Sequence, residues 1–97
     1  MQDQGDDPID RDLYDAILLL QDPDECRHFF EDLCTAQEVE AMRQRFEVAK
    51  ALAGGKKYSE IAEETGASTA TISRVRRSLS YGSKGYSVII DRMKGSD

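Results

Sequence analysis

The chain has 97 residues, two cysteines, two prolines, no tryptophan and a net charge of −6, which is typical of one small domain with a marginal core and no disulfide framework. Five aspartates occupy the first twelve residues where a signal peptide would be basic, and the longest apolar run, residues 16–20, is too short to span a bilayer. We therefore expect a cytoplasmic protein with no membrane partner, in which oligomerisation adds to the buried apolar surface.

The charge is unevenly distributed along the sequence. Residues 1–40 contain 13 acidic and 2 basic residues, a net charge of −11, whereas residues 41–97 contain 6 acidic and 11 basic residues, a net charge of +5; the two sum to −6. A distant acidic segment repels a phosphate only weakly, because the Debye length is about 8 Å at physiological salt. The second half can therefore bind a polyanion although the whole chain is acidic.

The N-terminal segment divides into two parts. Residues 1–7 carry acidic and polar side chains and are predicted to be a disordered acidic N-terminus, while residues 8–97 are predicted to form a single helical domain. A helix is expected over residues 8–21, beginning at an aspartate–proline pair. Leu18 and Leu19 widen its apolar face, which suggests contacts on more than one side.

Two further helices follow. Asp22 and Pro23 begin the second helix, and its predicted buried stripe consists of Cys26, Phe29, Phe30 and Leu33. Thr35 and Glu38 have the spacing of a capping box and begin a helix over residues 36–53, which the pair Gly54–Gly55 ends. The side chains expected on its apolar side are Val39, Met42, Phe46, Ala49, Leu52 and Ala53.

A helix-turn-helix is predicted at residues 58–81. Helices over 58–65 and 69–81 are joined at Gly66, because glycine tolerates the positive φ that such a turn requires, and Ser68 or Thr69 can cap the second helix. The apolar positions expected to pack inward are Ile61, Ala67, Ile72, Val75 and Leu79. A last helix is expected over residues 86–93, and no segment alternates like a strand, so the fold is predicted to be all-α.

The outer face of the helix over 69–81 then combines short residues near its N-terminus with arginines further along. Short side chains let a helix enter the major groove, where arginine contacts guanine edges or phosphates. The alternative is an ordinary helix hairpin with a solvated arginine face. The candidate DNA-binding residues are Lys56, Lys57, Ser68, Thr69, Ala70, Ser73, Arg74, Arg76, Arg77 and Lys84.

A match to a known family is carried by the run LCTAQEVEAMRQRFEVAKALAGGKKYSEIAEETGASTATISRVRRSL. Through this run, residues 13–94 resemble the Trp repressor-like family, in its TrpR-related YerC/YecD branch. The long helix that leads into the helix-turn-helix and the run ATISR are the more specific parts of the match. The resemblance implies an intertwined homodimer of about six helices per chain. It also implies that the recognition helices of the dimer enter successive major grooves of double-stranded DNA.

The resemblance also implies an effector pocket. Five residues keep the family's residue type at its pocket positions: Thr35, Arg45, Thr71, Arg74 and Ser78. Val75 stands where the family has glycine, and its side chain would intrude where an indole ring binds. We therefore do not expect tryptophan as a cofactor; another small aromatic or amino-acid effector, or none, stays open. The alternative role for Arg45 is a salt bridge with a carboxylate of the acidic first half.

The sequence predicts a sequence-specific DNA-binding transcriptional regulator, a repressor, that acts as a homodimer. The alternative is a protein-interaction module derived from a helix-turn-helix, which binds an acidic partner or the transcription machinery. An enzyme is not expected, because the chain has a single histidine and no recognisable nucleophile motif or glycine-rich loop. Cys26, His28 and Cys34 match no zinc spacing, so no metal is expected, and the cysteines are interpreted as reduced and partly buried.

Overall fold

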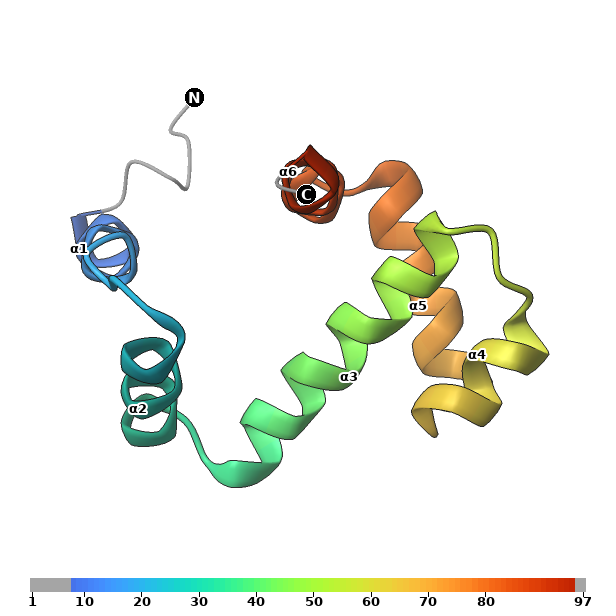
Figure 1. The fold of residues 1–97 in the computed structure, drawn as a ribbon, viewed down its shortest axis with the longest axis horizontal. Helices are drawn as coiled ribbons and strands as arrows, with labels where there is room; N and C mark the ends of the chain where they lie inside the picture. The colour runs from blue at the N-terminus through green and yellow to red at the C-terminus, as the bar shows by residue number, and fades with distance from the viewer. Residues whose placement is uncertain (1–7, 96–97) are drawn as a thin grey trace. The chain divides into compact units, whose positions relative to one another are not determined.

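The computed structural model describes residues 8–95, so the prediction of a disordered segment at residues 1–7 lies outside the described residues. The described residues form six helices (Figure 1): α1 Pro8–Ile17, α2 Pro23–Leu33, α3 Ala36–Ala53, α4 Tyr58–Thr65, α5 Thr69–Tyr81 and α6 Gly85–Gly95. This part of the chain contains no strand. The prediction of an all-α fold is therefore confirmed.

The chain divides into two compact units between Val39 and Glu40, and α3 contributes residues to both. Between residues 11 and 39 no side chain is buried, whereas the second unit holds the whole buried core. Residues 11–39 of the first unit therefore form no buried apolar core. The single domain expected over residues 8–97 stays a prediction.

Helix α1 is shorter than predicted. It ends at Ile17, and the next turn tightens, because the amides of Leu19 and Leu20 donate to the carbonyls of Ala16 and Ile17 at 3.0 and 3.1 Å, three residues back. Leu18 and Leu19 lie on this turn and are 81% and 76% exposed. The apolar run thus marks an exposed surface rather than a longer helix.

Helix α2 begins where the sequence predicted, but the prediction of its buried stripe was wrong. The Asp22 carboxylate accepts a hydrogen bond from the amide of Glu25 at 2.8 Å, which caps the helix. Cys26 and Leu33 are exposed, however, and the only shielded residues of the stripe are Phe29 and Phe30, which pack edge to face. The described residues of this unit thus shield Phe29 and Phe30 in part and leave Cys26 and Leu33 exposed.

The ends of α3 agree with the sequence. Thr35 and Glu38 form the predicted capping box, in which the amide of each donates to the side chain of the other at 2.8 and 3.1 Å. At the C-terminal end Gly55 adopts a φ of 85°. The buried stripe of α3 differs from the expected one: Val48, which was not expected in it, is fully buried, and Ala53, which was expected, is exposed.

The core of the second unit joins α3, α4, α5 and α6. In Figure 1, α4 and α5 lie beside the C-terminal half of α3, and the buried side chains come from all four helices and the α4–α5 turn. Of the five positions predicted to face inward around the turn, four are buried and Leu79 is half-buried. The buried residues are Val48, Ala49, Leu52, Ile61, Ala67, Ile72, Val75 and Ile90.

Gly66 generates a stability prediction. Its φ is 74°, and a Cβ atom at this position would meet no atom within 4 Å, so alanine would add backbone strain without a clash. We expect Gly66→Ala to lower the free energy of unfolding by about 1–2 kcal/mol in urea denaturation. Gly85→Ala is the matched control, since Gly85 has equally open space and no positive φ; its effect should stay within about 0.5 kcal/mol. Equal changes in the free energy of unfolding for the two variants would contradict a cost that arises from the positive φ of Gly66.

Candidate nucleic-acid interface

The turn between α4 and α5 is held by side chains from two directions. The hydroxyl of Thr65 donates to the carbonyl of Ile61 at 2.7 Å and accepts from the amide of Ala67 at 3.1 Å. From α3, the amide Nε2 of Gln44 donates to the Thr65 carbonyl at 3.2 Å. Together with the left-handed Gly66, these bonds fix the path of the chain from one helix into the other.

Ser68 caps α5, which settles one of the two options that the sequence left open. Its hydroxyl oxygen accepts from the amide of Thr71 at 3.1 Å and lies 3.2 Å from the hydroxyl of the same residue. The cap is neutral, and the first turn of α5 contains no acidic residue. The N-terminal end of α5 therefore keeps the partial positive charge of its helix dipole.

The two faces of α5 differ sharply. Ile72 and Val75 are each 1% exposed and pack in the core. The candidate contact residues of this helix are all exposed: Thr69, Ala70, Ser73, Arg74, Arg76 and Arg77. The structure thus brings the predicted residues of α5 together on the solvent side of one helix.

The electrostatic character of this region is uniformly positive. No aspartate or glutamate occurs from residue 65 to residue 90, a segment that contains Arg74, Arg76, Arg77 and Lys84. None of these four side chains forms an ion pair with another described residue, whereas Arg27 of α2 and two of the three basic residues of α3 do. Their charge is therefore available to an external anion.

The three candidate lysines differ from one another. Lys56 is paired, because its Nζ atom donates to Glu64 Oε1 at 2.7 Å, and this hydrogen bond raises the pKa of Lys56 above its ordinary value. Lys57 is exposed at the start of α4, where its backbone amide donates to the Glu60 carboxylate at 3.0 Å. Lys84 is exposed before α6 and has a φ of 72°.

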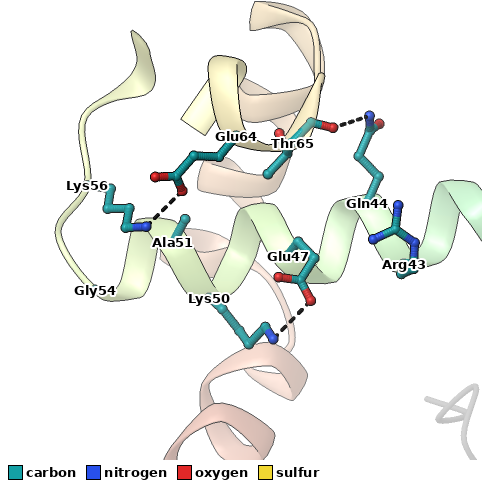
Figure 2. A pocket seen from close by; sticks show the side chains of 9 residues that line it. All are labelled: Arg43, Gln44, Glu47, Lys50, Ala51, Gly54, Lys56, Glu64 and Thr65. Carbon is teal, nitrogen blue, oxygen red and sulfur yellow. Dashed lines mark hydrogen bonds and ion pairs between the residues drawn. The ribbon is translucent and has the colours of Figure 1, made fainter. Parts of the chain in front are cut away.

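A polar groove of about 410 Å³ separates α3 from α4 (Figure 2). Figure 2 shows two bridges at its edges, the pair Lys56–Glu64 and the bond from Gln44 to Thr65. Sequence reasoning missed both Glu64 and Gln44. The partners lie 8 and 21 residues apart in the sequence and on different elements, so no helical spacing could have indicated either contact.

The predicted effector residues are distributed over both units. Thr35 belongs to the first unit, where its hydroxyl caps α3, and the other four belong to the second. Arg45 and Thr71 are half-buried, while Arg74 and Ser78 are exposed. Arg45 makes no ion pair with a described residue. A second hollow, of about 530 Å³, lies near the start of α6, and Ser78 is the only predicted effector residue that lines it. The pocket stays a prediction.

Other candidate groups can be placed within residues 8–95. The thiols of Cys26 and Cys34 are free, and Cys26 is exposed rather than partly buried as expected. This part of the chain holds no group of three or more potential metal ligands. Among its helices, none is both long enough and apolar enough to cross a membrane.

A short helix pair joined through a left-handed glycine, with an exposed cationic second helix, defines a helix-turn-helix protein. A family model described as Trp repressor protein matches residues 11–94. The uncharacterized protein YerC of Bacillus subtilis (strain 168) is 51% identical over 85 residues, which span 88% of this chain and 82% of that protein. The chain therefore belongs to the Trp repressor family.

Two solved structures have the same fold. The crystal structure of a TrpR-like protein from Eubacterium eligens ATCC 27750 matches with a TM-score of 0.90 and 49% identity, over 96% of both chains. The crystal structure of a proposed Trp repressor from Staphylococcus aureus matches with a TM-score of 0.89 and 46% identity, again over 96% of both chains. The predicted Trp repressor-like fold is confirmed.

The backbone of Lys84 generates a second prediction. A side chain at a φ of 72° carries a steric cost of about 1–2 kcal/mol, which glycine avoids at a smaller entropic cost. We expect Lys84→Gly to raise the free energy of unfolding by about 0.5–1 kcal/mol in urea denaturation. Lys84→Ala removes the same charge but keeps the strained φ, so it should leave stability nearly unchanged. A similar gain from both variants would mean that the charge, not the backbone, sets the cost.

Proposed function

We propose that the protein is a non-enzymatic, sequence-specific DNA-binding transcriptional regulator, a repressor, that acts in the cytoplasm as a homodimer through the helix-turn-helix of α4 and α5. The observation that carries the proposal is the outer face of α5. It is exposed, lies in a segment without carboxylates, and presents arginines that form no ion pair with residues 8–95. A helix of this kind fits the major groove, and its charges fit the phosphates beside it.

The contact residues fall into two groups by chemistry. The short residues at the N-terminal end of α5 would lie nearest the base edges, because only a thin helix end enters the groove deeply: Ser68, Thr69, Ala70 and Ser73. The longer cationic residues would contact guanines or phosphates: Lys57, Arg74, Arg76, Arg77 and Lys84. Lys56 would join them only when a phosphate displaces Glu64. That exchange is feasible because both side chains of the pair are about half exposed.

The homodimer is supported by apolar surface that the single chain leaves uncovered. Large hydrophobic residues are exposed in the first unit and again on α6, whereas soluble monomers rarely expose many of them together. A second copy of the chain would bury this surface and would pair two recognition helices for two DNA half-sites. The exposed residues are Leu13, Tyr14, Leu18, Leu19, Leu33, Val88, Ile89 and Met93.

A small-molecule effector remains part of the proposal, but tryptophan is not expected to be that effector. Arg45, Thr71, Arg74 and Ser78, which belong to the second unit, would line a site for a small aromatic or amino-acid ligand. Val75 argues against tryptophan, since its side chain is 1% exposed and packed among core residues. Repression needs no effector in this scheme, because a dimer bound to its operator blocks access to the DNA. The similar structure from Staphylococcus aureus, which is described as a proposed Trp repressor, supports the choice of repressor over activator.

Replacing arginines on α5 tests the proposal directly. If a dimer neutralises about 6 phosphates, the logarithm of the binding constant should fall with the logarithm of the salt concentration at a slope near −5. We expect Arg74→Ala and Arg77→Ala each to weaken specific binding by at least about tenfold in fluorescence anisotropy against an operator selected from random duplexes. A lost phosphate contact should also make the slope less steep by about 2 per dimer.

Arg27→Ala is the matched control. Arg27 is also exposed, but it lies on α2 and is paired with Asp24 and Glu31, each at 3.6 Å, so its removal should leave DNA binding nearly unchanged. Binding without salt dependence would refute the proposal. If the α5 variants kept DNA binding but lost an acidic protein partner in a pull-down, the interaction-module alternative would replace it.

The homodimer makes a separate prediction about Leu18. Its side chain is exposed in the single chain, so Leu18→Asp should not destabilise a monomer, whereas a buried carboxylate would disrupt a dimer interface. We expect the wild-type protein to sediment at twice the chain mass and Leu18→Asp to shift the equilibrium toward one chain. Gln21→Asp, an equally charged change at an exposed polar position nearby, should stay dimeric. A monomeric wild-type protein would remove the dimer from the proposal.

A further inference from the structure

The contact between Gln44 and the Thr65 carbonyl lies outside the exposed cationic face. Gln44 is half-buried on α3, and its Nε2 atom reaches the last residue of α4 at 3.2 Å, as Figure 2 shows. No candidate DNA contact takes part. This bond runs from a polar side chain of α3 to the helix-turn-helix hairpin, and α3 also packs against the hairpin through apolar core residues. The half-exposed pair Lys56–Glu64 instead joins the α3–α4 loop to α4.

The acceptor of this bond is a group that would otherwise lack a partner. The last carbonyls of a helix have no amide four residues further on to bind them, and at Thr65 the chain turns into the left-handed Gly66. No backbone amide donates to the Thr65 carbonyl in the structure. A partly buried carbonyl without a donor is costly, so the Gln44 amide favours the turn geometry in which the carbonyl faces α3.

A small change at this turn would move α5 by a large amount. The helix has 13 residues and is therefore about 20 Å long. A rotation of about 10° at Gly66 would displace its far end by roughly 3 Å, which exceeds the tolerance of a hydrogen bond to a base edge. Apolar packing resists separation of the helices, but it fixes their angle less sharply than a directional bond does.

We propose that Gln44 is a positioning residue that sets the angle of α5 through the Thr65 carbonyl, and so contributes to the sequence specificity of DNA binding without touching DNA. The inference rests on the proposed function. It separates two properties of the interface. The cations of α5 supply affinity for any duplex, whereas Gln44 holds those side chains in register with one base sequence.

Gln44→Met tests the inference, because methionine has a similar length and no hydrogen-bond donor. We expect specific binding to weaken by about fivefold to tenfold, the effect of one lost hydrogen bond, while binding to random duplexes and the salt slope stay as in the wild type. Gln37→Met is the matched control: the same substitution on the same helix, at an exposed position. Gln44→Lys retains a hydrogen-bond donor at this position. It should therefore keep most of the wild-type ratio of specific to random DNA binding.

Amide hydrogen exchange of the free protein separates positioning from plain stabilisation. In Gln44→Met the amides of residues 66–68 should exchange faster, while amides of core residues such as Val48 and Ile72 should keep their wild-type protection. Uniformly faster exchange would reduce Gln44 to a stabilising residue and overturn the inference. So would equal losses of specific and random binding, a changed salt slope, or no effect at all.

The two proposals fail in distinguishable ways. If the wild-type protein bound no duplex, the proposed function would fall, and the exchange measurement would still decide whether Gln44 fixes the turn. If the wild type bound DNA specifically and Gln44→Met did so equally well, only the positioning role would be refuted. Thr65→Val is the second variant; it removes the hydroxyl bonds to Ile61 and Ala67 but leaves the carbonyl that Gln44 binds.

Discussion

The packing of three side chains from the hairpin against α3 determines which surface the protein presents. Ile61, Ile72 and Val75 are almost fully buried with Val48 and neighbouring residues of α3. Burying an aliphatic side chain contributes about 1.5–3 kcal/mol, so this small cluster supplies much of the stability of the second unit. Because Ile72 and Val75 lie three residues apart on one face of α5, helical periodicity turns the arginines outward. The same residues that make the core therefore also expose the cationic face.

The uneven charge distribution reconciles a net charge of −6 with the proposed binding of DNA. The acidic excess lies in residues 1–40, while a run of 26 residues, 65–90, has no carboxylate at all. Within the second unit the basic residues outside this run include pairs with neighbouring acids, as at Lys50 and Glu47, 2.9 Å apart. Local pairing thus neutralises much of α3 and leaves the charge of α5 in excess, and screening limits repulsion from the acidic residues elsewhere.

Local signals in the sequence were sufficient for the helices but not for the contacts between them. The boundaries of α3, α4 and α5 followed from a capping box, a serine cap and glycines, whose geometry depends on residues a few positions apart. Tertiary contacts decided the rest. Val48 was missed because its burial depends on where the hairpin packs. Leu33 and Cys26 have the helical spacing of a buried face but are exposed, because spacing along a helix does not determine whether another element packs on that face. The exposed face of α5 followed from periodicity, whereas the pairing of Lys56 with Glu64 did not.

The first turns of α5 and α6 contain no acidic residue, so the positive end of each helix dipole lacks a carboxylate from its own helix. Helices α2, α3 and α4 place Asp24, Glu25, Glu38 or Glu60 in the first turn, where a carboxylate offsets the positive end of the dipole. Helix α5 instead relies on the neutral Ser68 and has no acid in its first turn. A carboxylate there would stabilise the isolated helix but would repel a phosphate. The neutral start of α5 fits the proposed approach to a phosphate backbone, and what distinguishes α5 from α6 is the arginine face that follows it.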